Sequence, residues 1–360
     1  MRVSGMTALF LTLGWAAGGI ATAAAEPVAN AAQTEAEQVS PWLLVPHVSS
    51  DPKLGTSLGF LAGYLFQMDD SSTASLAGLS ASYSSTDSLI AGLFLQSYWK
   101  ADSRRLTAFL GTGKIKNDYE DFLGSGLPLS TTDDLKAAYV RYLQEIQPNW
   151  YLGAQAVYTN YLIVGDDFTT QQLLRLGGLT GIDSGAAGLV LQFDNTNNKR
   201  TPTSGQLFTA SNLAFREALG GEQNFDTVSI EYKRYLPLAE KDVLAYRVSG
   251  RWTSDAPRSG YSSVDLRGYT RGQYLARHAT TVEFEQRWHI KGRFGVNAFA
   301  GLACLYGSGK SCGDSDNRFP SVGVGIQYLL REAEQMVITM DVAKGKEDNS
   351  GFYVRFGQAF

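Results

Sequence analysis

The side chains that could catalyse a reaction are few and lie far apart in the sequence. A hydrolase needs a nucleophile, a base and a group that orients the base, and these must meet in space. Ser125 lies in "LGSG", which lacks the GxSxG spacing of a nucleophile elbow. The carboxylate pairs Asp133-Asp134 and Asp166-Asp167 lie in turn-like sequence and are expected to be solvated. The three histidines, expected to be structural or solvated, are His47, His278 and His289. With no phosphate-binding loop, zinc-ligand spacing or EF-hand pattern, we predict no enzyme activity and no cofactor.

Two cysteines, Cys304 and Cys312, lie eight residues apart in "CLYGSGKSC". In an oxidising compartment this spacing predicts a disulfide that closes a small loop, and free thiols are the alternative. A metal site would need more ligands than this stretch offers, and no histidine lies between the cysteines. We therefore expect a structural disulfide here and no metal site.

The remaining candidate is the arginine-bearing stretch "DLRGYTRGQY", Asp265 to Tyr274, which separates two alternating segments. A guanidinium in a confined interior needs carboxylates that bind it in a bidentate manner. Glu283 and Glu285 in the following segment are the nearest candidates that face inward. The alternative is that Arg267 and Arg271 are only solvated loop charges.

The segments that must position these side chains alternate between apolar and polar residues, as β-strands with two different faces do. In "TVEFEQRWHI" the apolar face holds Val282, Phe284, Trp288 and Ile290. The polar face of the same segment holds Glu283, Glu285, Arg287 and His289. Similar alternation runs through "AYRVSGRWT", "SVGVGIQYLL", "MVITMDVAK" and "GFYVRFGQAF".

A soluble β-sandwich also alternates, but two features favour a membrane barrel. Glutamates and arginines on the polar faces oppose each other across strands, as in a hydrated lumen. The apolar faces are aromatic toward their ends, as at membrane interfaces. Lipid requires a closed barrel, because a sheet edge would leave backbone groups unpaired. We therefore predict an all-β fold, a transmembrane antiparallel β-barrel in contact with outer-membrane lipid.

Composition and the N-terminal sequence agree with an exported β-protein. The 360 residues include 38 Gly, 18 Tyr and 18 Phe, and the net charge of −4 argues against a nucleic-acid partner. Residues 1–25 are predicted to be a signal peptide, with Arg2, an apolar stretch and small residues before Glu26. No later apolar run is long enough for a transmembrane helix. We predict a periplasmic tail and lead-in segment over residues 26–53 and the barrel over 54–360.

The strand number follows from the length of the barrel region. At about ten residues per strand and connections of similar length, it holds roughly sixteen strands. Residues 111–184 cannot be divided into strands and loops from the pattern, because "DYEDFLGSGLPLSTTD" and "GDDFTTQQLLRLGGLTGIDSG" suit either.

Several motifs resemble those of the bacterial surface antigen superfamily, which includes BamA and TamA. "LRGY", Leu266-Arg267-Gly268-Tyr269, resembles its (V/I)RG(F/Y) signature. "GLVLQFDNTNNKRTPTSGQLF", Gly188 to Phe208, is similar to its strand-turn-strand pattern with an aspartate, a proline and a glycine. The segments "GVGIQYLL" and "GFYVRFGQAF" resemble its last strands, and the resemblance covers nearly the whole mature chain.

The resemblance implies a sixteen-stranded barrel whose sixth extracellular loop folds into the lumen. Arg267 is then an internal latch on acidic side chains, Gly268 allows a tight turn, and Tyr269 packs on the barrel wall. The family often supplies an aspartate in an FxDxG pattern. Here Phe299 to Ala303, "FAGLA", has Gly301 in the aspartate place, which moves the expected partner to Glu283 or Glu285.

The last segment also resembles the signal by which outer-membrane barrels are recognised for assembly. Its pattern is formed by Phe352, Val354, Phe356 and Phe360, and Gln358 departs from it. The same residues are also expected to form the closing strand.

The resemblance implies a role in outer-membrane protein assembly, insertion or transport. Family members carry periplasmic POTRA domains before the barrel, but about thirty residues between Glu26 and Leu54 are too few for one. We therefore predict a barrel without POTRA domains that acts with a separate periplasmic or outer-membrane partner. The alternative is a passive or loop-plugged diffusion channel. The sequence leaves the client, cargo, partner and oligomeric state open.

Overall fold

The computed structural model of the chain describes residues 40–51, 55–119, 129–165, 181–238, 241–269, 273–307, 309–332, 334–347 and 349–360. The signal peptide predicted at residues 1–25 lies outside these ranges, as do Arg271 and most of the predicted tail. Within the described residues no helix is long and apolar enough to cross a membrane.

The described residues form long antiparallel strands joined by turns and loops. In chain order the strands are β1 (Trp42–Asp51), β2 (Gly55–Phe66), β3 (Ser75–Ser84), β4 (Leu89–Trp99), β5 (Arg104–Tyr119), β6 (Leu129–Gln147), β7 (Trp150–Gly165), β8 (Gly181–Asp194), β9 (Gly205–Phe215), β10 (Phe225–Pro237), β11 (Val243–Ser254), β12 (Ser262–Ser263), β13 (Leu275–Ala276), β14 (His278–Lys291), β15 (Phe294–Tyr306), β16 (Arg318–Arg331), β17 (Met336–Lys344) and β18 (Ser350–Phe356). Within the described ranges, three short 3-10 helices lie in connections: η2 (Glu217–Leu219), η3 (Arg258–Gly260) and η4 (Ser315–Asn317).

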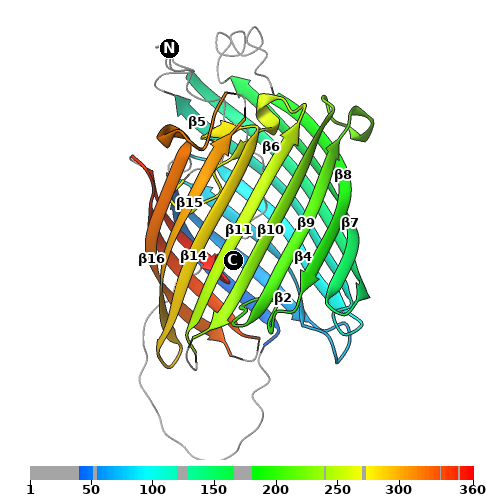
Figure 1. The fold of residues 1–360 in the computed structure, drawn as a ribbon, viewed down its shortest axis with the longest axis vertical. Coiled ribbons are helices and arrows are strands. Elements are labelled where there is room, and N and C mark those ends of the chain that lie inside the picture. Colours follow the sequence, from blue (N-terminus) through cyan, green and yellow to red (C-terminus); the bar gives the residue numbers. More distant parts are fainter. Residues whose placement is uncertain are drawn as a thin grey trace, which may run out of the picture.

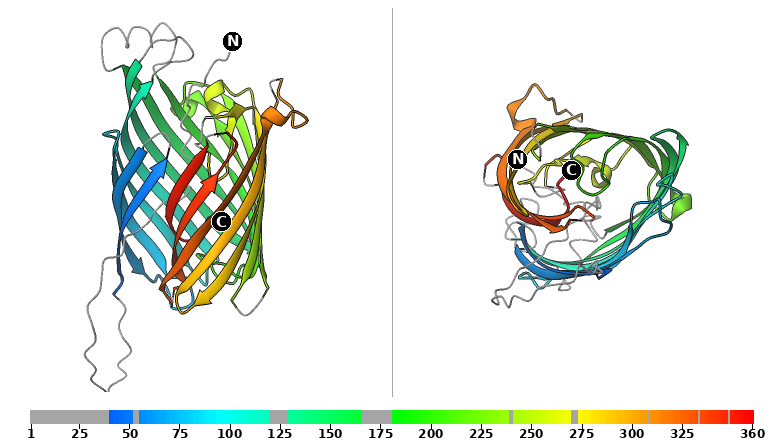
Figure 2. Two further views of the ribbon diagram at one scale, coloured as in Figure 1. Left: turned by 90° about the vertical axis from the view of Figure 1, so that its left-hand side faces the viewer. Right: turned by 90° about the horizontal axis from the view of Figure 1, so that it is seen from below.

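Sixteen of these strands form one antiparallel sheet whose order follows the chain (Figures 1 and 2). The short strands β12 and β13 are left out of this sheet and pair with each other in the connection from β11 to β14. The order closes into a ring where β1 meets β18, and this seam has a single register pair, Ser50 with Phe352. By contrast, β1 pairs with β2 along its whole length.

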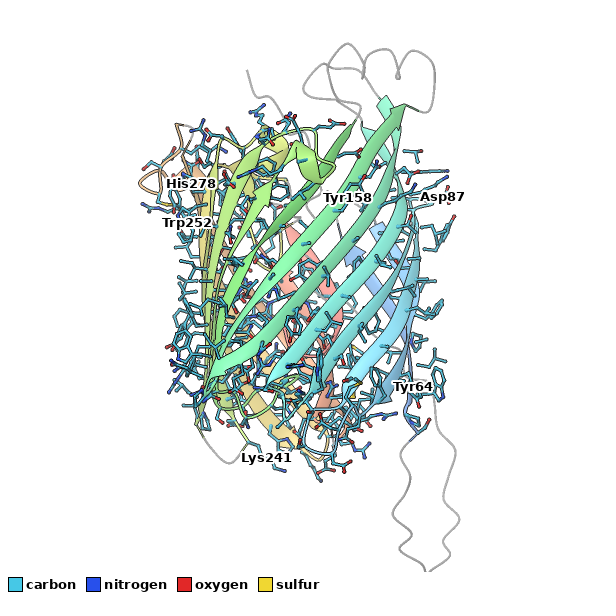
Figure 3. All side chains as sticks on the ribbon, turned by 90° about the vertical axis from the view of Figure 1, so that its right-hand side faces the viewer. Tyr64, Asp87, Tyr158, Lys241, Trp252 and His278 are labelled. Carbon is cyan, nitrogen blue, oxygen red and sulfur yellow. A yellow bond between two sulfur atoms is a disulfide. The ribbon has the colours of Figure 1, made fainter. Side chains whose placement is uncertain are left out.

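The two faces of the strands have the polarity that lipid on the outside and a polar interior require. On β14, Val282 and Phe284 are 36% and 51% exposed, whereas Glu283 and Glu285 are 2% and 0% exposed. Apolar side chains therefore point out of the ring and charged ones point in. The two ends of the ring are marked in Figure 3 by Lys241 and Tyr64 on one side and by His278, Tyr158 and Asp87 on the other. We call these the Lys241 end and the His278 end.

The first strand begins earlier than the sequence pattern predicts. Residues 42–51 belong to β1 and pair residue by residue with Gly55–Tyr64, so the expected barrel boundary at residue 54 falls inside the sheet. The outward side chains of β1 include Trp42 and Leu44, which are 65% and 73% exposed. This correction follows from "WLLVPHV", where Pro46 and an unbroken apolar run hide the two-residue period.

The region that the pattern left undivided forms the longest strands. β5 has 16 residues, β6 has 19 and β7 has 16, and each pairs with the next along nearly its full length. In parts of these strands small and polar residues stand on both faces, so the alternation of polarity is weak there. Cross-strand pairing decides their conformation, and pairing is not visible in a local pattern.

The chain does not continue its outward face to Phe360. β18 ends at Phe356, and Gly357 adopts φ +97°, a left-handed conformation that turns the chain. Phe360 is 7% exposed and packs against the inward side chains of Tyr235, Val243 and Ala245. The end of the chain therefore lies inside the ring, as the view along its axis in Figure 2 shows. Phe360 therefore does not share a face with Phe352 as the pattern predicted.

Candidate functional site

The connection between β11 and β14, residues 255–277, carries the arginine-bearing stretch onto the inner face of the sheet. Val264, Leu266 and Tyr269 are buried and pack against Ala303 and Leu305 of β15, among other residues. The glycine at position 301 makes room for this packing, because a Cβ there would lie 2.7 Å from the Leu266 side chain. The place where the family pattern expects an aspartate is thus occupied by a leucine of the loop.

Arg267 is surrounded by three carboxylates and one aromatic ring. Its Nη2 lies 2.8 Å from Glu283 Oε1 and 2.7 Å from Glu285 Oε2, and its Nη1 donates to Asp341 Oδ2 at 2.9 Å. The guanidinium carbon lies 3.3 Å from the centroid of the Phe299 ring. Arg267 is 6% exposed, so these charge-assisted and cation–π contacts act where water competes little.

Each of the three carboxylates is shared with a second arginine. Arg247 lies opposite Glu283 in the pairing of β11 with β14, and its Nη2 donates to Glu283 Oε2 at 3.1 Å. The other two pairs are Arg287 with Glu285 and Arg355 with Asp341, both at 2.7 Å. We call these four arginines and three carboxylates the arginine cluster. Arg247 has two further carboxylate neighbours, Asp265 at 3.0 Å, whose side chain is 40% exposed, and Glu231 at 3.7 Å.

The two residues after Arg267 fix the loop backbone. Gly268 has φ +93°, and its N–H donates to the Tyr353 hydroxyl at 2.8 Å. A Cβ at this position would lie 3.1 Å from the backbone nitrogen of Gly345, so a side chain here would require the neighbouring backbone to shift by a few tenths of an ångström. The Tyr269 hydroxyl donates to the Pro320 carbonyl at 2.5 Å and accepts the Lys346 N–H at 2.6 Å.

Sequence reasoning named two of the three carboxylates around Arg267 and missed the third. Glu283 and Glu285 lie next to the loop in sequence, whereas Asp341 is 74 residues away, on β17. A signal for Asp341 did exist, because it lies on the polar face of "MVITMDVAK". Only the curvature of the sheet brings β17 within reach of a residue that also contacts β14.

The cysteines and His278 occupy structural positions, and the side chain of His47 lies outside the described part of the chain. A disulfide joins Cys304, near the end of β15, to Cys312 in the connection that follows this strand. The His278 ring accepts the Thr253 N–H through Nδ1 at 3.4 Å and lies 5.2 Å from the Tyr306 ring. Among the described residues no group of three or more histidines, cysteines, aspartates or glutamates could hold a metal ion.

Solved structures with a similar fold are outer-membrane barrels. BamA from Haemophilus ducreyi lacking POTRA domains 1–3 aligns with 88% of this chain and 69% of its own, at 15% identity and a TM-score of 0.54. CdiB from Escherichia coli aligns with 88% of this chain and 62% of its own, at 12% identity and a TM-score of 0.62. CdiB from Acinetobacter baumannii aligns with 88% of this chain and 59% of its own, at 11% identity and a TM-score of 0.56. This chain thus spans about three fifths to two thirds of the length of these similar structures.

Sequence comparison assigns the family. No curated protein matches this sequence. The profile of the Omp85 superfamily domain, however, matches residues 73–360, which include β3 to β18 and the whole arginine cluster. The inward arginine loop, the antiparallel sheet and the similar solved structures agree with this match. The chain is a bacterial outer-membrane β-barrel and belongs to the Omp85 superfamily.

Proposed function

We propose that the protein acts in the assembly, insertion or transport of polypeptides at the outer membrane, together with a separate partner. Membership of the Omp85 superfamily supports a role in outer-membrane assembly or transport. The partner and the client are part of the proposal, because the chain spans only part of the similar structures.

The observation that carries the proposal is the placement of the arginine cluster relative to the seam. Arg267 ties the loop to β14 and also to β17, which is next to β18. β18 in turn meets β1 through one register pair. A loop that anchors the strands on one side of a weakly paired seam is suited to act as a latch, holding that side in place while the seam opens for a client.

A second candidate function is a loop-plugged diffusion channel. The inner face carries charged side chains that suit ion passage, including Lys233 and Arg247, which both contact Glu231. The arginine-bearing loop, which lies on the inner face of the sheet, would then act as the plug.

One experiment separates the two functions. Vesicles that contain wild-type barrel or the Arg267→Ala variant are offered an unfolded outer-membrane barrel, and insertion rate and ion conductance are recorded together. We expect the wild type to accelerate insertion and the variant to lose this acceleration. The matched control is Arg318→Ala, since the Arg318 side chain donates to carbonyls of its own loop, those of Cys312 and Gly313.

Conductance without faster insertion, increased by Arg267→Ala, would favour the channel instead. If neither activity is detected, the same assay is repeated with a periplasmic extract. No acceleration with the extract would contradict the assembly role.

A further inference from the structure

The turn between β8 and β9, residues 195–204, lies at the opposite end of the ring from the arginine-bearing loop. Tyr235 pairs with Gly205, which places the turn at the Lys241 end, where β10 finishes. The turn belongs to the stretch with an aspartate, a proline and a glycine, Gly188 to Phe208, and the arginine cluster does not explain it.

The turn crosses the ring instead of pointing away from it. The Thr201 hydroxyl donates to the Gln335 carbonyl, between β16 and β17, at 2.6 Å. Arg200 donates to the carbonyl of Ala74, just before β3. In the ring order β16 is five strands from β9 in one direction, and β3 is five strands from β8 in the other. The turn therefore contacts both walls on the far side of the ring.

The base of the turn is rigid. Asp194 is 5% exposed and accepts hydrogen bonds from Lys199 at 2.9 Å and from Arg105 on β5 at 2.5 Å. The Asn198 side chain accepts the N–H groups of Arg200 and Thr201, both at 2.8 Å. This bonding presets the two residues that reach across, so little conformational entropy is lost when they bind the far walls.

The inner face of β14 holds the turn and the end of the chain together. Arg287 donates to the Pro202 carbonyl at 3.3 Å and to the Phe360 main-chain oxygen at 2.7 Å. The same guanidinium donates to Glu285, the residue that also contacts Arg267. Arg287 thus connects the turn and residues 357–360 with the arginine cluster.

We propose that residues 195–204 and 357–360 form an inner closure, a plug that blocks the barrel at the Lys241 end. Sixteen-stranded barrels are wide enough to leave an aqueous channel, so a turn that spans the ring obstructs that channel. The barrel is then closed twice, by the arginine-bearing loop and by the inner closure. Release of the loop alone does not open a continuous path. This inference concerns only the path through the lumen and needs no client. A rise in conductance with Arg267→Ala alone, the outcome that favours a channel plugged by the loop, counts against it.

The test measures single-channel conductance of the purified barrel in planar bilayers. Asn197 N–H donates to the Ser204 carbonyl at 3.2 Å, so residues 198–203 can be replaced by Asn-Gly, a two-residue hairpin turn. We expect Arg267→Ala alone to leave conductance at the wild-type level. Arg267→Ala combined with the shortened turn is expected to raise it severalfold. A rise in conductance with the shortened turn alone would also support the inner closure. It would show in addition that the arginine-bearing loop does not block the lumen.

Two results would overturn the proposal. One is a severalfold rise with Arg267→Ala alone, and the other is wild-type conductance in the folded combined variant. Folding is checked by heat-modifiable migration on gels.

If the shortened turn prevents folding, Arg200→Gln with Thr201→Val in the Arg267→Ala background decides the question instead. A higher conductance than that of Arg267→Ala alone supports the inner closure, and an unchanged conductance contradicts it. The matched control is Thr203→Val, because the Thr203 hydroxyl accepts from Asn197 within the turn instead of reaching a wall of the ring.

Discussion

Arg267 contacts three buried carboxylates, and each carboxylate keeps a second arginine when Arg267 is removed. We therefore expect Arg267→Ala to lower the free energy of unfolding by about 3 kcal/mol, the lower end of the range for breaking a buried ion pair. Arg267→Lys should not restore it, because an ammonium cannot reach Glu283 and Asp341 with a planar fork. Urea unfolding of the barrel in detergent micelles measures the difference. A loss no larger than that of Arg318→Ala would contradict a structural role for the cluster.

Substitution of Gly268 tests how closely the backbone of the arginine-bearing loop approaches Gly345, just after β17. We expect Gly268→Ala to cost about 1 to 3 kcal/mol, because φ is +93° and Gly345 leaves a Cβ little room. Gly292 is the matched control, with φ +60° and no atom within 4 Å of the place that a Cβ would take. Gly292→Ala should therefore show only the backbone strain of about 1 kcal/mol. Equal losses for the two variants in the same urea assay would mean that the close approach adds nothing.

At the scale of single elements, the Asp69 carboxylate joins the turn between β2 and β3 to the turn between β4 and β5. Asp69 accepts hydrogen bonds from the Ser72 and Ser71 hydroxyls and from the Lys100 N–H, at 2.7, 2.8 and 2.6 Å. Lys100, Ala101 and Asp102 all have positive φ, a strained turn that these bonds help to hold. Hydrogen bonding, chiefly from Ser72, lowers the pKa of Asp69 to about 2 from its ordinary value of 3.8.

The depressed pKa of Asp69 gives the sign of a pH effect on these turns. A group with a lower pKa in the folded state stabilises that state above its unfolded pKa. The contribution is lost as pH falls through the folded value, so the turns should loosen between pH 3.8 and about 2. Hydrogen exchange at the Lys100 amide measures this loosening. In the Asp69→Asn variant the Lys100 amide should exchange quickly at every pH. Identical pH profiles for the variant and the wild type would refute the role of the Asp69 carboxylate in holding the turns.

The strands that could be read from sequence are those whose inward and outward side chains differ in polarity. On β14 acidic residues such as Glu283 alternate with apolar ones such as Phe284, interrupted only by Gln286, so the strand and its orientation follow from the local pattern. On β6, small and polar residues occupy both faces, and the strand exists because β5 and β7 pair with it. The turn at Gly357 is likewise invisible in the pattern, since the burial of Phe360 depends on side chains of β10 and β11.

The candidate site follows the same rule. Glu283 and Glu285 were predictable because they directly follow the loop, and a loop that folds back meets the next strand first. Asp341 and Arg287 required the ring itself: β17 reaches Arg267 by curvature, and Arg287 contacts the far turn across the lumen. Local sequence carries the types of side chain, while closure of the sheet decides which of them meet.

At the scale of the whole molecule, the strands of the ring are paired unevenly. Every neighbouring pair of described sheet strands has a register of seven or more residue pairs except β1 with β18, which has one, Ser50 with Phe352. Backbone hydrogen bonds between strands are the main barrier to parting them in lipid, because an unpaired group there costs several kcal/mol. The seam is therefore where the sheet opens most easily if polypeptides enter the membrane through this barrel.

Locking the seam tests this consequence. Ser50→Cys with Phe352→Cys, joined by a short bifunctional maleimide, should abolish the acceleration of client insertion and leave conductance unchanged. The two native cysteines are already paired and do not react with the reagent. The matched control joins Val48→Cys to Leu58→Cys, a register pair of β1 with β2, where the sheet is continuous and a cross-link should change nothing. Undiminished insertion by the locked seam would show that clients do not pass between β1 and β18, and would direct attention to the lumen.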